Sequence, residues 1–255
     1  MAGEINWFFT VLAAVFGLFA GSFLNVLIYR LPRGEQLAGG RSRCPACGHA
    51  LAWFDLVPVL SFLLLQGRCR HCLARISLRY PLVELLTGAV FATLFLRFGL
   101  TPALVKYLFL GAVLIAASFI DLEHYLIPDR LVLAGFLGGV VLGVLACDVG
   151  ILSSLLGAAV SGGVLLLIAV FSRGGMGGGD IKLAAVTGLF LGWPLGPLGL
   201  FGGACLGGLA GILLLLFKLK GRKDPIPFGP FIALGSLLSL LWGREFLAWY
   251  FGHFG

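Results

Sequence analysis

Long apolar runs dominate the sequence, and short polar or glycine-rich stretches separate each run from the next. Eight runs stand out, at 7–29, 82–96, 103–120, 131–147, 151–171, 183–193, 195–217 and 229–251. With their flanks, most can supply the roughly 20 helical residues that cross a hydrocarbon core of about 30 Å. The pattern therefore predicts an all-α polytopic membrane protein with about eight transmembrane helices.

Composition agrees with this interpretation and removes other classes. Of the residues, 60% are hydrophobic and 11% are charged, and 39 are glycine, which excludes a soluble domain. The first run is too long for a cleaved signal peptide and has no small-residue cleavage site, so we expect a retained helix. The lipid bilayer is thus an expected partner. We find no dinucleotide fingerprint and no phosphate-binding loop, and we expect no nucleic-acid partner.

The run at 183–193 is short, and the positive charges decide whether it crosses. With eight crossings and the N-terminus outside, only Arg97, Lys106 and Arg244 face outward. Without that crossing, the basic cluster at 218–223 would face outward, against the positive-inside tendency. We therefore predict that both termini lie outside and that the cytoplasmic face is basic. The residues expected on that face are Arg30, Arg33, Arg41, Arg43, Arg68, Arg70, Arg75, Arg79, Arg130, Arg173, Lys182, Lys218, Lys220, Arg222 and Lys223.

The polar segment after the first run carries two Cys-x-x-Cys pairs. The pairs are separated by 21 residues, and their members are Cys44, Cys47, Cys69 and Cys72. Four thiolates in this pattern suit tetrahedral Zn²⁺, and a metal stabilises a segment too small to bury a core of its own. We predict a structural zinc site. His49 and His71 could each replace a ligand, although surface positions suit them better. The chain then divides into 1–79, the first helix with this cytoplasmic segment, and 80–255, a transmembrane domain.

Two aspartates stand at the edges of apolar runs, and both are expected on the cytoplasmic side. Asp121 ends the third run, and Asp180 follows the glycine-rich stretch 174–179. A stretch so rich in glycine is a poor helix, so it predicts a loop that opens a helix at Asp180. An isolated Asp in such a place is often only an N-cap. A second Asp on the same side and at a similar depth favours chemistry.

The depth of Asp180 follows from the length of its helix. Fourteen residues rise about 21 Å, less than the hydrocarbon core, so the helix start is expected in a recessed, water-filled cavity. Ionisable groups at membrane depth are candidates for function. Two carboxyl groups that face each other can share a proton and act as base and acid on a water molecule. This chemistry is that of an aspartyl protease.

Several motifs together resemble the bacterial type IV prepilin peptidases, aspartyl proteases of the inner membrane. The resemblance covers nearly the whole chain. It rests on 21–32, the two Cys-x-x-Cys pairs, Asp121 with Ile127-Pro128-Asp129, Gly177-Gly178-Gly179-Asp180 followed by Lys182, and 226–231 before the last helix.

The resemblance implies roles that the pattern alone does not give. Asp121 and Asp180 are then the catalytic pair, and Gly177, Gly178, Gly179 and Lys182 form an active-site loop. Members of the family cleave the basic leader from prepilins or pseudopilins of pilus and secretion systems at the cytoplasmic membrane face. Many also methylate the new N-terminus with S-adenosylmethionine, and the cysteine segment is typical of these bifunctional members.

A basic leader must be held by local acidic groups, because the cytoplasmic face is itself basic. Glu84, Glu123 and Asp129 are the inside acidic residues available near the aspartate pair. Glu123 and Asp129 follow Asp121 closely and are predicted leader contacts. The alternative, equally open, is that they only cap and solvate the next helix.

Two other classes of function account for part of the pattern. A proton-coupled transporter also places carboxylates in helices, but it does not explain the cysteine pairs, and we find no convincing internal repeat. A non-catalytic assembly factor of a pilus or secretion machine could keep the zinc segment, but it has no need of both aspartates.

Overall fold

The computed structural model describes residues 2–36, 40, 42–172, 175–221 and 224–254. Gly174 of the glycine-rich stretch and the predicted cytoplasmic cations Arg41, Arg173, Arg222 and Lys223 lie outside these residues. In the described part the structure is helical, with two isolated β-bridges. The elements are α1 (Ala2–Arg30), η1 (Trp53–Leu56), α2 (Leu60–Leu64), α3 (Arg79–Phe98), α4 (Pro102–His124), α5 (Asp129–Ala146), α6 (Ile151–Phe171), α7 (Gly178–Leu191), α8 (Leu195–Leu216) and α9 (Gly229–Phe254).

Each of the eight apolar runs forms a helix, which confirms the all-α prediction. Within the described residues, seven helices are long and apolar enough to cross a membrane. The eighth, α7, has 14 residues and is the short run that the charge distribution assigned as a crossing. The chain is a multi-pass membrane protein.

The chain forms two compact units, Met1–Leu100 and Thr101–Gly255. In the first unit, α1 packs along α3. The two backbones meet at glycines, since a Cβ atom on Gly17 would lie 2.7 Å from the Cα atom of Gly88. The structural division therefore falls after α3, whereas the boundary expected from the sequence falls before it. The functional boundary expected after residue 79 stays a prediction.

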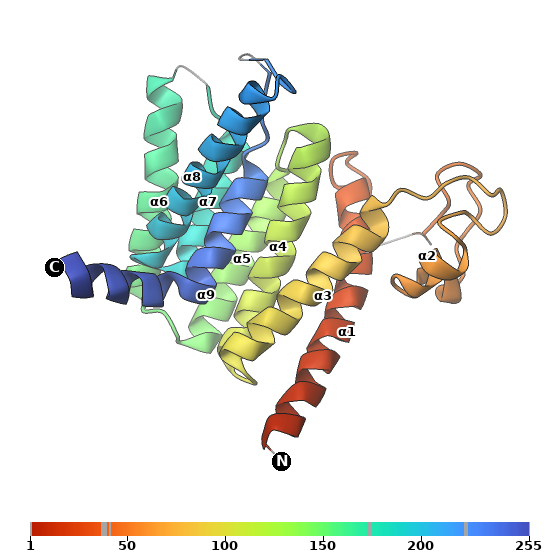
Figure 1. The fold of residues 1–255 in the computed structure, drawn as a ribbon, viewed down its shortest axis with the longest axis horizontal. Coiled ribbons are helices and arrows are strands. Elements are labelled where there is room, and N and C mark those ends of the chain that lie inside the picture. Colours follow the sequence, from red (N-terminus) through yellow and green to blue (C-terminus); the bar gives the residue numbers. More distant parts are fainter. Residues whose placement is uncertain (1, 37–39, 41, 173–174, 222–223, 255) are drawn as a thin grey trace. The chain divides into compact units, whose positions relative to one another are not determined.

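In the second unit, α7 is the central element (Figure 1), in contact with α4, α5, α6, α8 and α9. Its buried residues run from Leu183 to Leu191 and lie on all sides of the helix. A helix that is apolar all round belongs in a protein interior or a membrane. The short α7 is therefore enclosed largely by its neighbours, and its length need not match the lipid.

Two glycines bring α6 and α7 into backbone contact. A Cβ atom on Gly188 would overlap the carbonyl oxygen of Gly157, and the reverse also holds. Small residues at such crossings are the usual means of close helix packing in membranes. This contact fixes α7 against α6 and, with it, the position of Asp180.

We expect Gly188→Ala to destabilise the second unit by about 1–3 kcal/mol, the usual cost of overpacking. Thermal unfolding in detergent measures the loss. The matched control is Gly163→Ala on α6, where an added Cβ meets nothing within 4 Å. The control should keep or slightly raise stability, because alanine favours helix over glycine by about 1 kcal/mol. Equal melting temperatures for both variants would refute this account of the α6–α7 contact.

Chain direction determines which residues share an end of the second unit. Asp121 lies in the last turn of α4, Asp180 in the first turn of α7, and Gly229 begins α9. Because α4 runs opposite to α7 and α9, these three residues come to one end of the bundle. The opposite end holds the connections between α5 and α6 and between α7 and α8.

Candidate active site

The first carboxyl group, Asp121, is buried in the last turn of α4, with 5% of its surface exposed. The helix ends because Tyr125 adopts a left-handed conformation, with φ of 53°, and its N–H donates to the Asp121 carbonyl at 2.9 Å. The chain then passes through Ile127 and Pro128 into α5. This termination leaves the Asp121 side chain facing protein rather than water.

Gly229 at the start of α9 contacts that carboxylate directly. Its N–H donates to Asp121 Oδ2 at 2.8 Å. The first N–H groups of a helix have no partner within the helix, so they are free to bind an acidic side chain. A Cβ atom at this position would lie 2.9 Å from the same oxygen, so any other residue displaces the carboxylate. No pattern in the sequence assigned this role to Gly229, although the Gly-Pro pair opening a helix marks a free N–H.

The second carboxyl group, Asp180, is the third residue of α7. Its Oδ1 atom is buried and has no hydrogen-bond partner among the described residues. An unsatisfied buried carboxylate oxygen is costly, and such groups mark binding or catalytic sites.

Glycine in the first turn of α7 allows this helix to approach the segment that follows Asp121. A Cβ atom on Gly179 would lie 2.9 Å from the Cβ atom of Ile127, in the segment that follows Asp121. A larger residue would push the start of α7 away from that segment. The structure thus places Asp121, Asp180, Gly177, Gly178 and Gly179 at one end of the second unit, and their catalytic roles stay a prediction. The helix α7 begins at Gly178, two residues before the start expected from the sequence, so Gly178 and Gly179 belong to its first turn and not to a loop.

Lys182 and Asp129 form an ion pair beside this site. Lys182 Nζ lies 2.6 Å from Asp129 Oδ1, and both side chains are more than half exposed. Exposed pairs contribute about 0–1 kcal/mol, so this pair connects the N-terminal parts of α5 and α7 without adding much stability. A cationic leader that binds Asp129 has to compete with Lys182.

The other two acidic candidates differ in their surroundings. Glu123 is partly exposed, and its Oε2 lies 4.0 Å from His124 Nε2. Glu84 belongs to the first unit, where it is buried and its Oε2 accepts the Val59 N–H at 2.8 Å. Glu84 therefore anchors the polar segment to α3. Their contact with a leader stays a prediction.

The four cysteines form a cluster suited to a metal ion. Their Sγ atoms all lie within 4.8 Å of one another, and those of Cys44 and Cys72 are 3.8 Å apart. A tetrahedron with Zn–S bonds of about 2.3 Å has edges of about 3.8 Å. Each Cys-x-x-Cys turn is closed by a residue with positive φ, Gly48 in one and Leu73 in the other.

Neither histidine belongs to the described cluster. The rings of His49 and His71 instead contact each other at a tilt of 34°, with centroids 3.5 Å apart. Backbone N–H groups of Cys72 and His71 lower the pKa of the Cys69 thiol to about 7. These donors stabilise the thiolate, which is the form that binds metal.

Together, the helices and the paired carboxyl groups define a membrane-embedded acid–base site in a polytopic protein. Comparison with known proteins gives a matching result. Residues 15–98 match the bacterial peptidase A24 N-terminal domain, and residues 108–212 match the type IV leader peptidase family. The chain belongs to the type IV leader peptidase family.

Curated relatives match nearly end to end. One from Aeromonas hydrophila is 37% identical, covering 100% of this chain and 98% of its own. One from Bacillus subtilis is 37% identical, and the match covers 92% of this chain and 95% of the relative. One from Pseudomonas aeruginosa is 34% identical, covering 93% and 91%. All three are named prepilin leader peptidase/N-methyltransferase. No solved structure matches the chain.

Proposed function

We propose that this protein cleaves the basic leader peptide from prepilins or pseudopilins and then methylates the new N-terminal residue. The observation that carries the proposal is that Asp121 and Asp180 lie at one end of the second unit, where the first turn of α7 approaches the segment after Asp121. The names of the full-length relatives support the substrate and the second activity. A transporter or an assembly factor is not favoured by these relatives.

In the proposed cleavage, the two carboxyl groups share one proton. The ionised group accepts a proton from a water molecule as the water oxygen attacks the scissile carbonyl carbon. The protonated group gives its proton to the carbonyl oxygen and, as the tetrahedral species collapses, a proton passes to the leaving amine. The N–H of Gly229 holds Asp121 in place throughout.

The expected location is the bacterial inner membrane, with the site opening to the cytoplasm. The positive charges of the second unit support this orientation, since Arg130, Lys182, Lys218 and Lys220 lie at the helix ends that share an end of the bundle with the two aspartates. A prepilin then presents its leader from the cytoplasm, while its apolar segment lies between membrane helices.

Zn²⁺ is the metal we assign to the four cysteines, in a structural role. Four thiolates close the coordination sphere and leave no open position for a substrate water molecule. The methyl donor is expected to be S-adenosylmethionine, because the relatives carry the N-methyltransferase name. No residue of this chain is assigned to its binding.

Incubation of the purified protein with a prepilin and labelled S-adenosylmethionine tests both activities in one experiment. Mass spectrometry should show loss of the leader and gain of one methyl group on the released N-terminus. An intact prepilin under conditions where a relative is active would refute the peptidase. A cleaved but unmethylated product would refute only the second activity.

Reversing the charge of Glu123 tests how the leader is held. We expect Glu123→Lys to raise KM for a basic leader about 2–10-fold, because attraction to the partly exposed carboxylate becomes repulsion. A leader with its Lys or Arg changed to Glu should recover part of that loss. Steady-state cleavage of both leaders gives the comparison, and Asp129→Lys repeats it beside Lys182. Unchanged preference in both variants would show that these residues do not read leader charge.

A further inference from the structure

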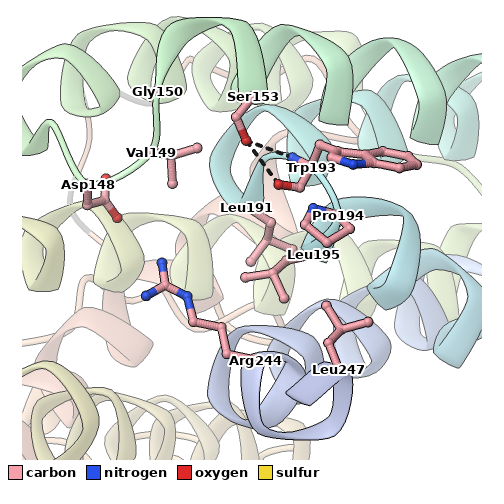
Figure 2. A pocket seen from close by; sticks show the side chains of 10 residues that line it. All are labelled: Asp148, Val149, Gly150, Ser153, Leu191, Trp193, Pro194, Leu195, Arg244 and Leu247. Atoms are coloured by element: carbon pink, nitrogen blue, oxygen red, sulfur yellow. Dashed lines mark hydrogen bonds between the residues drawn. The ribbon is translucent and has the colours of Figure 1, made fainter. Parts of the chain in front are cut away.

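A pocket of about 210 Å³ lies at the end of the second unit opposite the aspartate pair. It is formed by the connection between α5 and α6, the turn between α7 and α8, and one face of α9 (Figure 2). Leu191, Leu195 and Leu247 supply apolar lining, and Asp148 and Arg244 are its charged residues. Sites for whole small molecules usually measure about 300–1,000 Å³, so this pocket suits a compact head group.

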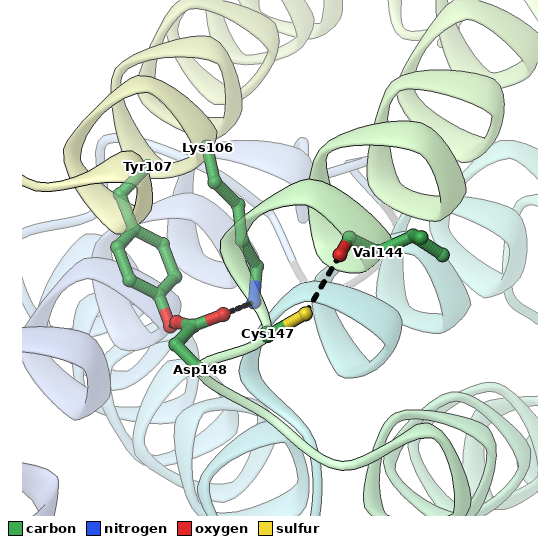
Figure 3. Close-up of polar contacts among 5 residues, drawn as sticks. All are labelled: Lys106, Tyr107, Val144, Cys147 and Asp148. Carbon is green, nitrogen blue, oxygen red and sulfur yellow. Dashed lines mark hydrogen bonds and ion pairs between the residues drawn. The ribbon is translucent and has the colours of Figure 1, made fainter.

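Asp148 is already satisfied by two residues of α4. Its Oδ1 accepts from Lys106 Nζ at 2.8 Å, and its Oδ2 accepts from the Tyr107 hydroxyl (Figure 3). Lys106 is 1% exposed and Asp148 is partly exposed, and in this ion pair their opposite charges cancel. Asp148 therefore has little capacity left for another cation.

Arg244 is consequently a surplus positive charge. Its guanidinium group points into the pocket toward Asp148 (Figure 2), yet among the described residues it forms no hydrogen bond or ion pair. The planar guanidinium carries five donors and suits phosphate or carboxylate oxygens. The pocket thus offers unpaired donors above an apolar floor.

Aromatic residues place this pocket at the level of lipid head groups. Trp193 lines the pocket and is exposed. Trp242, Trp249 and Tyr250 on α9 do not line the pocket but are also exposed. Tryptophan and tyrosine gather where the hydrocarbon core meets the head groups. The last turns of α9 also leave the direction of the bundle (Figure 1). The anion present at this depth in every membrane is the phospholipid phosphate.

We propose that this pocket binds a phospholipid of the outer leaflet, with its phosphate on Arg244 and the start of its acyl chains on Leu195 and Leu247. Lys106 contributes indirectly, because it keeps Asp148 from neutralising Arg244. The site is separate from the aspartate pair, and only its assignment to the outer leaflet rests on the proposed cytoplasmic position of that pair.

Binding to the delipidated, full-length protein in detergent tests the site. The probes are dioctanoyl phosphatidylglycerol, dioctanoyl phosphatidylethanolamine, dioctanoylglycerol and inorganic phosphate. Both phospholipids should raise the melting temperature and appear as adducts in native mass spectrometry, since a ligand stabilises the state that it binds. Dioctanoylglycerol has the same chains without the phosphate and should do neither.

Arginine variants show whether the effect arises in this pocket. We expect Arg244→Ala to weaken phospholipid binding about tenfold or more, as loss of a charge-assisted contact predicts. Arg244→Lys should retain part of it. The matched control is Arg97→Ala, an exposed arginine at the end of α3 that should bind as the unchanged protein does.

Three results would overturn the proposal. Equal phospholipid binding by Arg244→Ala and by the unchanged protein would show that Arg244 does not contact the phosphate. Equal stabilisation by dioctanoylglycerol reduces the pocket to an apolar surface. Arg244-dependent stabilisation by inorganic phosphate, without any by the phospholipids, assigns the site to a free anion instead.

Discussion

Asp121→Asn and Asp180→Asn should each lower leader cleavage by about 10²–10⁴-fold or more, while the protein still inserts and folds. Each substitution removes one of the two groups that exchange protons with the attacking water molecule, and general acid–base catalysis contributes about this much. The amide is nearly the same size as the carboxyl group, so packing around α4 and α7 is preserved. Mass spectrometry of a purified prepilin after incubation measures cleavage.

Asp224→Asn is the control for this pair. Asp224 is an exposed carboxylate between α8 and α9, and its Oδ2 accepts the Gly221 N–H at 2.6 Å. The Asp224→Asn variant should cleave the prepilin as the unchanged protein does, and all three variants should have similar melting temperatures. Appreciable cleavage by either Asp121→Asn or Asp180→Asn would exclude a mechanism that needs two aspartates.

Changing all four clustered cysteines to Ser should reduce bound zinc from one ion per chain to none. Binding of a structural zinc ion supplies about 10–16 kcal/mol in small zinc domains, so the polar segment between α1 and α3 should lose its fold. Elemental analysis of protein purified without chelator measures the zinc. Limited proteolysis measures the segment, which should be cut far faster.

The two other cysteines provide the matched control. Cys147 and Cys205 lie in the second unit, outside the cluster, so replacing both by Ser should leave the zinc content at one. Protein with no zinc before any substitution would exclude the metal. So would zinc that persists after all four clustered cysteines are removed.

The helices were predictable because burial in lipid requires long apolar runs, whose ends are visible without any tertiary information. The short α7 was predictable for another reason, namely that the positive charges after α8 would face outward if α7 did not cross. The shared end of the two aspartates followed from the two long runs between them, 131–147 and 151–171, because two crossings return the chain to the side from which it started.

Contacts between distant residues were not predictable. Gly229 lies 108 residues from the carboxylate it contacts, and Lys182 lies 53 residues from Asp129. Neither separation leaves a periodic trace in the sequence. The short elements η1 and α2 were missed because helices of four and five residues are too short to show a helical period in the sequence.

The hydrogen bond from Gly229 gives the two aspartates different surroundings although their side chains are identical. Asp121 already holds a donor, whereas Asp180 keeps a buried oxygen with no partner among the described residues. A substrate peptide bond therefore meets two carboxyl groups in different surroundings, and the bond itself has two different ends, a carbonyl and an N–H. Only one direction of the substrate chain matches both ends to both carboxyl groups. A leader of reversed sequence, with the same charge and the same side chains, is consequently expected to pass this site uncut.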